Sequence, residues 1–240
     1  MEKILIFGAI CPFWASFRQP QTVNVHVTYP IPPPSTLYGM LNAARGKPQD
    51  WNADRDNWQI SLIVESKGTF LETFSKIFKP ARKDRGKDGL FDRTILMRQK
   101  LVKVHYTIYL KTDESLLVEA QQALNSPHWP LYLGESDDVV DIVNPRIVEC
   151  QPEEVLQVHS IIPGFVEGGQ LVKVPTHFIE PSKKQFQGRV SYTNTREQWQ
   201  MHQQFYSIPP EGESVALSEP HLAYPIEGRN IIFNGDFGEN

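Results

Sequence analysis

At 240 residues with 40% apolar side chains, the chain can bury one large core or two smaller ones, and it does not have the composition of a disordered protein. Two cysteines, Cys11 and Cys150, and the lack of any apolar run near the roughly 20 residues of a membrane-spanning helix argue against a disulfide-rich secreted protein and a membrane protein. The formal net charge of −4 is uneven, because residues 76–111 hold eleven Lys or Arg and three Asp. We therefore expect a cytoplasmic protein with buried, unreactive thiols and a basic segment on an acidic body.

The first predicted element is a buried strand from Lys3 to Phe7, because this apolar run is short, rich in strand formers and followed by Gly8. We expect a loop over residues 8–27. Its aromatic and basic side chains could contact a ligand or pack at an edge of the core, and the sequence favours neither role. These side chains are Phe13, Trp14, Phe17, Arg18 and His26.

A rigid proline turn and a helix come next. Pro30 to Pro34 cannot continue a helix or a central strand, and the apolar spacing after them predicts a helix that ends before Gly46. Ser35 or Thr36 is the expected N-cap. A second strand is predicted from Trp58 to Ser66.

The sequence changes character over residues 76–103, where a polar, glycine-containing centre is flanked by apolar and basic residues. This pattern is typical of a long β-hairpin arm with a mobile tip, although the tip could be an ordinary solvated loop. Positive charge continues along the second half of the arm, which a purely solubilising loop does not need. The cations of the segment are Arg82, Lys83, Arg85, Lys87, Arg93, Arg98 and Lys100.

The next elements complete an α+β unit. Val102 to Leu110 is predicted as a strand, Asp113 to Asn125 as an amphipathic helix with an acidic first turn, and Pro130 to Val143 as a strand broken by a turn. The order strand, helix, strand, strand, helix, strand is that of a ferredoxin-like (RRM-like) fold, with the arm inserted at residues 76–103. We assign this unit to residues 1–143.

Residues 144–240 contain short β-prone runs separated by Pro and Gly, which predicts a small, mostly antiparallel β-rich subdomain. Arg196 to Tyr206 could also form a helix. Because no internal repeat or low-complexity linker separates the two parts, we expect them to pack closely.

Common catalytic motifs are missing from the sequence. The seven His are dispersed, CxxC and HExxH do not occur, and the group Asp137, Asp138 and Asp141 is better explained as a solvated turn. The nucleotide-binding patterns GxGxxG and GxxxxGK[ST] and the hydrolase pattern GxSxG are also missing. We expect no metal site and no cofactor.

One catalytic alternative stays open, the metal-independent cleavage of RNA. That reaction needs a base for the 2′-hydroxyl and a cation or proton donor for the phosphorane, which Tyr, His and Lys can supply. Nothing in the sequence brings three such residues together. The candidates are His26, Tyr29, Lys103, His105, Tyr106 and Lys111.

The opening part of the chain resembles the Cas five family of CRISPR-associated proteins, the subunit at the foot of type I Cascade complexes. The matching residues are Phe7-Gly8, Ala15 to Pro20 (ASFRQP) and above all Thr28 to Leu41 (TYPIPPPSTLYGML). A weaker match is Pro130 to Gly134 (PLYLG). These matches lie within roughly the first 140 residues, and they are most similar to the I-B group.

The resemblance implies a right-hand shape, with a ferredoxin-like palm, a hairpin thumb and a variable C-terminal β part. In such proteins the palm binds the 5′ handle of the CRISPR RNA (crRNA), and the thumb lies across the guide and contacts the Cas seven family backbone subunit. Stacked aromatics and phosphate-binding cations are the expected RNA contacts. For the palm they are Phe13, Trp14, Phe17, Arg18, Tyr29, Tyr38 and Arg45, and for the thumb the seven cations named above.

The implied partners are the crRNA, the Cas seven backbone, the Cas eight large subunit and target DNA near the PAM, with no membrane. In some complexes of this kind a transposition apparatus is also a partner. One branch of the family cuts the precursor RNA with a Tyr, Lys and His set in which Lys and His are adjacent. Lys103 and His105 are separated by Val104, so we expect a non-catalytic binder, with an endoribonuclease as the alternative.

Overall fold

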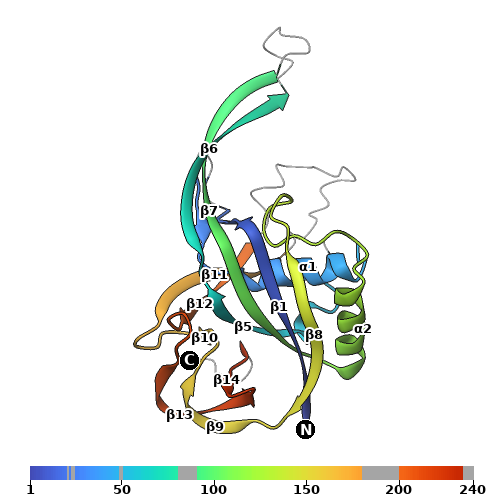
Figure 1. The fold of residues 1–240 in the computed structure, drawn as a ribbon, viewed down its shortest axis with the longest axis vertical. Coiled ribbons are helices and arrows are strands. Elements are labelled where there is room, and N and C mark those ends of the chain that lie inside the picture. Colours follow the sequence, from blue (N-terminus) through green and yellow to red (C-terminus); the bar gives the residue numbers. More distant parts are fainter. Residues whose placement is uncertain (21, 23–24, 49–50, 81–90, 180–199, 235–240) are drawn as a thin grey trace, which may run out of the picture.

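The computed structural model describes residues 1–20, 22, 25–48, 51–80, 91–179 and 200–234 (Figure 1). Most described elements are strands. The helices are α1 (Pro34–Ala44), α2 (Glu114–Asn125) and the short 3-10 helix η1 (Arg55–Asn57). The strands are β1 (Glu2–Ala15), β2 (Phe17–Arg18), β3 (Val25–His26), β4 (Thr28–Tyr29), β5 (Gln59–Ser66), β6 (Thr69–Pro80), β7 (Phe91–Lys111), β8 (Asp141–Cys150), β9 (Glu153–Val158), β10 (Ile162–Pro163), β11 (Gln170–Ile179), β12 (Gln200–Ile208), β13 (Val215–Ile226) and β14 (Arg229–Ile231).

The centre of the molecule is a sheet in which β5, β7, β1 and β8 lie in that order, and every neighbouring pair among them is antiparallel. Along the chain, β1, α1, β5, β7, α2 and β8 follow the predicted order of strand, helix, strand, strand, helix, strand. The middle of β1 is buried on both faces, which explains why it reads as a continuous apolar run rather than an alternating one.

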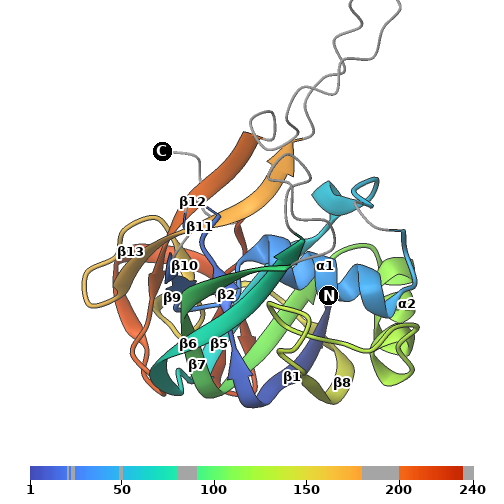
Figure 2. The ribbon, with the colours of Figure 1, turned by 90° about the horizontal axis from the view of Figure 1, so that it is seen from above.

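Both faces of this sheet are covered. The helices pack on one face, where Phe7 of β1 and Tyr106 of β7 join Leu41 and Leu117 in the main hydrophobic core. The opposite face packs against β13 and β14, so that Ile6 shares a second core with residues of those strands. Figure 2 shows α1 and α2 on the other side of the body from β9, β10 and β13. The N-terminal and C-terminal parts of the chain therefore pack together, as predicted.

Strand β1 is much longer than predicted. It continues from Glu2 through Gly8 to Ala15, so Phe13 and Trp14 lie at the end of a strand and not in a loop. The alternating exposure of the later residues and the Cys-Pro dipeptide hide this continuation in the sequence. Pro12 is tolerated because the pairing with β7 changes register between Cys11 and Trp14.

Helix α1 begins earlier than predicted and has no side-chain cap. Pro33 is the N-cap residue and Pro34 the first helical residue, so the expected cap from Ser35 or Thr36 is wrong. The Pro33 carbonyl accepts hydrogen bonds from the amides of Thr36 and Leu37, and proline suits the first helical position because its missing amide is not needed there. Gly46 follows the helix with a φ of +67°, as expected for a C-terminal glycine.

The predicted hairpin arm is present, but it starts at Thr69 rather than at residue 76. Strand β6 pairs with the first half of β7 from Thr69–Val102 to Pro80–Phe91, while the second half of β7 belongs to the central sheet. In Figure 1 the arm projects well away from the body. One 21-residue strand thus connects the arm to the core.

The last strand of the central sheet is β8, which begins only at Asp141, while residues 130–140 contain an isolated bridge between Tyr132 and Val139. The expected boundary at 143/144 falls inside β8, which pairs with β1 as far as Cys150. Beyond it, the described strands pair antiparallel, as predicted. The helix considered for residues 196–206 is wrong from Gln200 onward, where β12 pairs with β11.

No helix within the described part of the chain has the length and apolar character needed to cross a membrane.

Candidate nucleic-acid interface

The arm leaves the sheet at a point where β1, β7 and the connection between β5 and β6 are all irregular. β1 and β7 pair at Cys11–Val104 and next at Trp14–Val102, so Pro12 and Phe13 form a bulge opposite Lys103. Lys103 itself has a φ of 59°, and Gly68 between β5 and β6 has a φ of 66°. Bulges turn and twist strands, and here they mark the place where the arm leaves the sheet.

This bulge exposes two aromatic side chains. Phe13 is 63% and Trp14 39% exposed, and their ring centroids lie 6.1 Å apart at an interplanar angle of 51°. The ammonium group of Lys100 lies 5.1 Å from the centre of the Trp14 ring and so attracts its π face. Large aromatic side chains held on the surface of a protein are typical of an interaction site.

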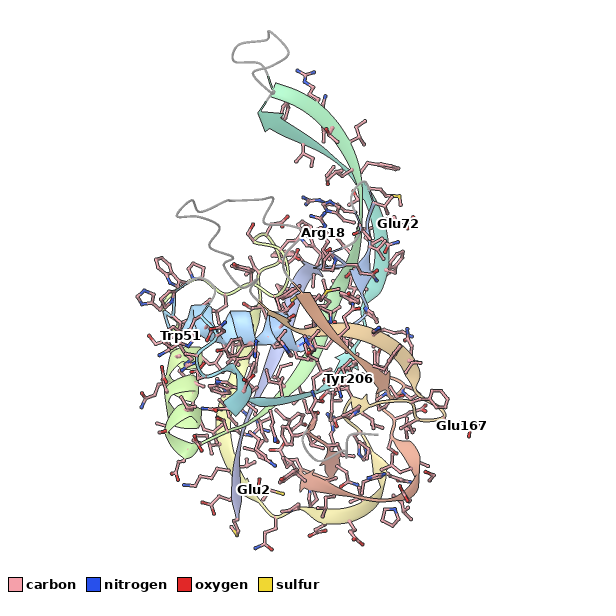
Figure 3. All side chains as sticks on the ribbon, turned by 180° about the vertical axis from the view of Figure 1, so that it is seen from behind. Glu2, Arg18, Trp51, Glu72, Glu167 and Tyr206 are labelled. Atoms are coloured by element: carbon pink, nitrogen blue, oxygen red, sulfur yellow. The ribbon has the colours of Figure 1, made fainter. Side chains whose placement is uncertain are left out.

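Arg18 adds an exposed cation to the same region. It ends β2, which pairs with β4, and its Nη2 donates a hydrogen bond of 2.7 Å to the Thr22 carbonyl. Figure 3 shows Arg18 at the base of the arm, at the level of Glu72 in β6. Exposed aromatic rings and a guanidinium group therefore both occur at the base of the arm, and RNA contact by Phe13, Trp14 and Arg18 stays a prediction.

The arm presents an apolar face to solvent. Directly opposite residues of β6 and β7 share a face, and the exposed face carries Phe70, Phe74 and Phe78, which are 54%, 75% and 58% exposed. Ile95 lies on it as well, and the guanidinium of Arg93 lies 5.7 Å from the Phe78 ring centre. Glu72, Lys76 and Gln99 lie between the aromatic rings on this face, and the cations of β7 are divided between the two faces.

Two of the predicted RNA-binding cations face inward. Lys100 is only 5% exposed, and its Nζ lies 2.9 Å from Oδ1 of the fully buried Asp138. Burial raises the pKa of Asp138, although its bonds from Lys100 and from backbone amides oppose that rise. Arg98 pairs with Glu135 at 3.3 Å. The prediction of a phosphate contact from Lys100 is therefore corrected, since its charge already balances a buried carboxylate.

The same correction applies to Arg45. Its guanidinium is almost wholly buried and lies 2.6 Å from Asp54 and 3.1 Å from Glu119. The hydroxyl of Tyr38 donates to the same Asp54, and burial, with that bond, raises the pKa of Tyr38 to about 12. Phe17 and Tyr29 are also buried, the first in edge contact with Tyr106. These four predicted contacts hold the fold together instead.

The predicted cations at the arm tip, Arg82, Lys83, Arg85 and Lys87, lie outside the described residues.

The catalytic candidates do not converge. His26 pairs with Arg98 in β7, seven residues before His105, which corresponds to roughly 23 Å along a strand. Burial and the nearby Arg18 cation lower the pKa of His26, which also lies 3.7 Å from Glu135. The hydroxyl of Tyr29 accepts a bond from Gln203, while Lys103 is exposed at the bulge. The set His26, Tyr29, Lys103 and His105 thus has no common focus.

Among the described residues, no group of three His, Cys, Asp or Glu side chains is placed to hold a metal ion. Both cysteines are buried and free, and burial raises the pKa of Cys11 to about 12. A thiol in that state is a poor nucleophile, which agrees with the prediction of unreactive cysteines.

A second surface was missed by the sequence analysis. An open groove of about 770 Å³ lies beside α1. It is lined by side chains from α1, from residues 47–55, from residues 129–136 and from β11, which are far apart in the sequence. Its signal in the sequence is weak, because Trp51, Trp129 and Tyr132 each lie near a polar turn but come from two separate segments.

One family model matches most of the chain, and solved structures share its fold. A family model described as CRISPR-associated protein (Cas_Cas5) matches residues 12–207. A chain of a "CRISPR RNA-guided surveillance complex" is similar in fold, with a TM-score of 0.58 and 18% identity over 90% of this chain and 91% of that one. A "Cas protein" has a TM-score of 0.51 and 19% identity over 87% and 96% of the two chains.

A CRISPR protein from Archaeoglobus fulgidus has a TM-score of 0.50 and 14% identity, over 96% of this chain and 98% of that chain. At these identities the likeness to solved structures shows a shared fold. Among curated protein sequences no significant match is found.

Proposed function

The chain belongs to the CRISPR-associated Cas5 family, and we propose that it serves in a type I Cascade complex as a non-catalytic subunit that anchors the 5′ handle of the crRNA. The observation that carries the proposal is that the exposed Phe13 and Trp14 and the exposed Arg18 all lie at the base of a projecting arm. The similarity in fold to a chain of a CRISPR RNA-guided surveillance complex is consistent with a role of this kind.

In this proposal the unit formed by β1, α1, β5, β7, α2 and β8 is a ferredoxin-like palm. Its strand order, with neighbours all antiparallel and both helices packed on one face, supports that description. The arm formed by β6 and the first half of β7 is then the thumb. The I-B subtype that the opening sequence resembles remains part of the proposal.

The handle is single-stranded, so its bases are free to stack. Phe13 and Trp14 offer ring faces for one or two of them, and Arg18 offers a cation for an adjacent phosphate. The buried Lys100 contributes from below, because its cation near the Trp14 ring orients that ring toward solvent. We therefore assign handle binding to Phe13, Trp14 and Arg18, and not to the buried Tyr38 or Arg45.

We assign two contacts to the thumb. Its apolar face, with Phe70, Phe74 and Phe78, suits a protein surface, which we propose is the adjacent Cas seven family backbone subunit. Its cations suit the guide RNA, because residues 76–111 carry a local excess of positive charge in a chain of net charge −4. If both contacts form together, the chain caps the end of the Cas seven family backbone of the complex.

Docking of the Cas eight family large subunit beside the PAM of target DNA is proposed from the family alone. The same holds for recruitment of a nuclease or, in some complexes, a transposition apparatus.

Handle binding is tested by measuring the affinity of the full chain for guide RNA. Arg18→Glu and Trp14→Ala should each weaken binding by about tenfold, the size of one lost stack or charged contact. Lys173→Glu on β11 is the control, since Lys173 is an exposed cation away from the arm. Wild-type affinity in both test variants would exclude the base of the arm as the handle site.

The alternative function is a metal-independent endoribonuclease. Separation of His26 from His105 along β7 supports the non-catalytic proposal. Incubating the protein with CRISPR repeat RNA in EDTA discriminates the two functions. Specific cleavage that is abolished in His105→Ala would establish the nuclease and refute the non-catalytic role.

A further inference from the structure

The groove beside α1 has features of a ligand site that the proposed handle contacts do not use. Tyr38 and Gly39 of α1 line it together with residues from three other segments, and its volume is about 770 Å³. In Figure 3, Trp51 lies next to α1 while Arg18 lies at the base of the arm, so the two regions are distinct.

Two cations are part of the groove. Lys47 and Arg55 line it, and none of its described lining residues is Asp or Glu. This is unexpected for a chain with 28 acidic and 24 basic residues. Each cation is paired with a carboxylate that does not line the groove, Lys47 with Glu119 at 3.0 Å and Arg55 with Asp56 at 2.8 Å. Because both carboxylates are solvent-accessible, a phosphate on a ligand can compete with them for the two cations.

Four aromatic rings around the groove remain open to solvent. Trp129 is 56%, Tyr132 44%, Phe178 38% and Trp51 36% exposed. Isolated exposed aromatics are common, but four around one concavity offer several flat apolar surfaces to a single ligand. Planar ligands gain most from such surfaces, because they can stack on a ring face.

Two of these rings are held in place by the fold. The Trp51 Nε1 donates to Asp54 Oδ1 at 3.1 Å, and the Trp51 carbonyl accepts from Asn42 Nδ2 at 3.1 Å. The chain before Trp129 is tied to α1, since the His128 amide donates to the Ala44 carbonyl at 2.9 Å. The His128 ring packs edge-on against Trp129, with centroids 4.8 Å apart. Rings that are ordered in advance lose little freedom on binding.

Polar groups for reading a ligand are also present. Asn52, Thr176 and His177 line the groove, and the Thr176 hydroxyl lies 3.1 Å from Nδ1 of His177. The His177 ring stacks on His202 with centroids 4.4 Å apart, which fixes its plane.

We propose that this groove binds an unstacked nucleotide of single-stranded RNA, with the base stacked on Trp51 or Trp129 and a phosphate near Lys47 or Arg55. The inference rests on the proposed function, since it adds a second site for the same RNA-binding protein, on the helix side of the body. A protein partner could also cover exposed aromatics, but ring faces together with two cations, and no Asp or Glu among the described lining residues, favour RNA.

Position-specific cross-linking tests the site directly. The assembled complex is prepared with guide RNAs that carry 4-thiouridine at single positions, irradiated and mapped by mass spectrometry. We expect one position to cross-link to the peptide containing Trp51 or Trp129. Cross-links at Phe13 and Trp14 without any in the groove would overturn the inference and leave the proposed function intact.

Variants of the full chain provide the energetic test, with guide RNA binding measured by fluorescence anisotropy. Trp129→Ala, Trp51→Ala and Lys47→Glu should each weaken binding about tenfold, and Trp51→Phe, which keeps a ring, should bind close to wild type. Phe165→Ala is the matched control, because Phe165 is 74% exposed and lies outside the groove. Unchanged melting temperatures establish that the variants are folded.

The outcomes separate the two proposals. If the groove variants bind guide RNA as wild type does while Trp14→Ala does not, the groove is not an RNA site and the handle proposal stands. If the groove variants retain RNA but lose a protein subunit of the complex, the groove is a protein interface and the inference is wrong. If the wild-type chain and its complex do not bind guide RNA, both proposals fail.

Discussion

Arg45 and Lys100 carry their charges inside the protein, where each balances carboxylates that the fold has buried. Arg45 pairs with Asp54 and Glu119, and Lys100 pairs with Asp138, whose second oxygen accepts bonds from the amides of Ser16 and Glu135. Sequence alone could not distinguish these cations from the exposed Arg18, because a charge's partner is set by chain segments far away. Lys100 and Asp138 are 38 residues apart.

The Arg45–Asp54 pair predicts a pH-dependent stability. Burial disfavours the Asp54 carboxylate, but hydrogen bonds from Arg45 and Tyr38 outweigh it and hold its pKa below the usual 3.8. The stabilisation is therefore complete above about pH 5 and is lost as the pH falls through the lowered pKa. Asp54→Asn should lower the free energy of unfolding by about 2 kcal/mol at pH 7 and by progressively less as the pH falls below the usual Asp pKa of 3.8, as measured by urea denaturation.

Asp56→Asn is the control for this prediction. Asp56 is exposed and pairs with Arg55 at the surface, so its loss should cost about 0.5 kcal/mol or less at either pH. If the difference in the free energy of unfolding between wild type and Asp54→Asn stays constant from pH 7 to pH 3, the ionised Asp54 is not the source of the stabilisation.

At the scale of elements, the sequence predicts the helices and strands whose formation depends mainly on their own apolar periodicity. Helix α2, the second half of β7 and β5 appear where their apolar periodicity places them. The length of β1 was missed, because its continuation to Ala15 depends on pairing with β7 and on a bulge that accommodates Pro12. The groove residues Trp51 and Trp129 were missed for a similar reason, since only the packing of distant segments against α1 brings them together.

The junction between sheet and arm depends on Gly68. Its φ of +66° is unfavourable for other residues, and a Cβ there would lie 2.2 Å from the Val102 carbonyl oxygen, in a neighbouring strand that cannot easily move. Gly68→Ala should therefore lower the free energy of unfolding by about 3 kcal/mol. Gly228→Ala is the matched control, because Gly228 has a φ of +78° but no atom within 4 Å of its Cβ position. This variant should lower the free energy of unfolding by only about 1 kcal/mol. Equal losses in thermal or urea unfolding would refute the clash.

A substitution on the apolar face of the arm should impair assembly of the complex without lowering the stability of the chain. Phe74 is 75% exposed in the isolated chain, so Phe74→Ser should change the free energy of unfolding by about 0.5 kcal/mol or less. If the face contacts the Cas seven family subunit, the same change should weaken that contact by about 2 kcal/mol, seen as less subunit recovered with the tagged chain. Phe165→Ser is equally exposed and should assemble normally. Normal assembly of Phe74→Ser would remove this face from the interface.

At the scale of the whole molecule, the proposed RNA contacts lie on a protein of net charge −4. Outside residues 76–111 the chain holds 13 basic and 25 acidic residues, so most of its surface repels RNA. Local positive regions must then provide the attraction, and residues 76–111, which include most of the arm, hold the excess of cations.

Such a distribution has a measurable signature in the salt dependence of guide RNA binding. Each phosphate contact with single-stranded RNA contributes a slope of about −0.7 to the plot of log affinity against log salt. Replacing Arg82, Lys83 and Arg85 by Ala should make the slope shallower by about 2, because three contacts are removed. Lys173→Ala, on a strand away from the arm, should leave the slope unchanged. If the triple variant keeps the wild-type slope, the arm cations do not contact the guide, and the positive excess of this segment is used within the fold, as it is at Lys100.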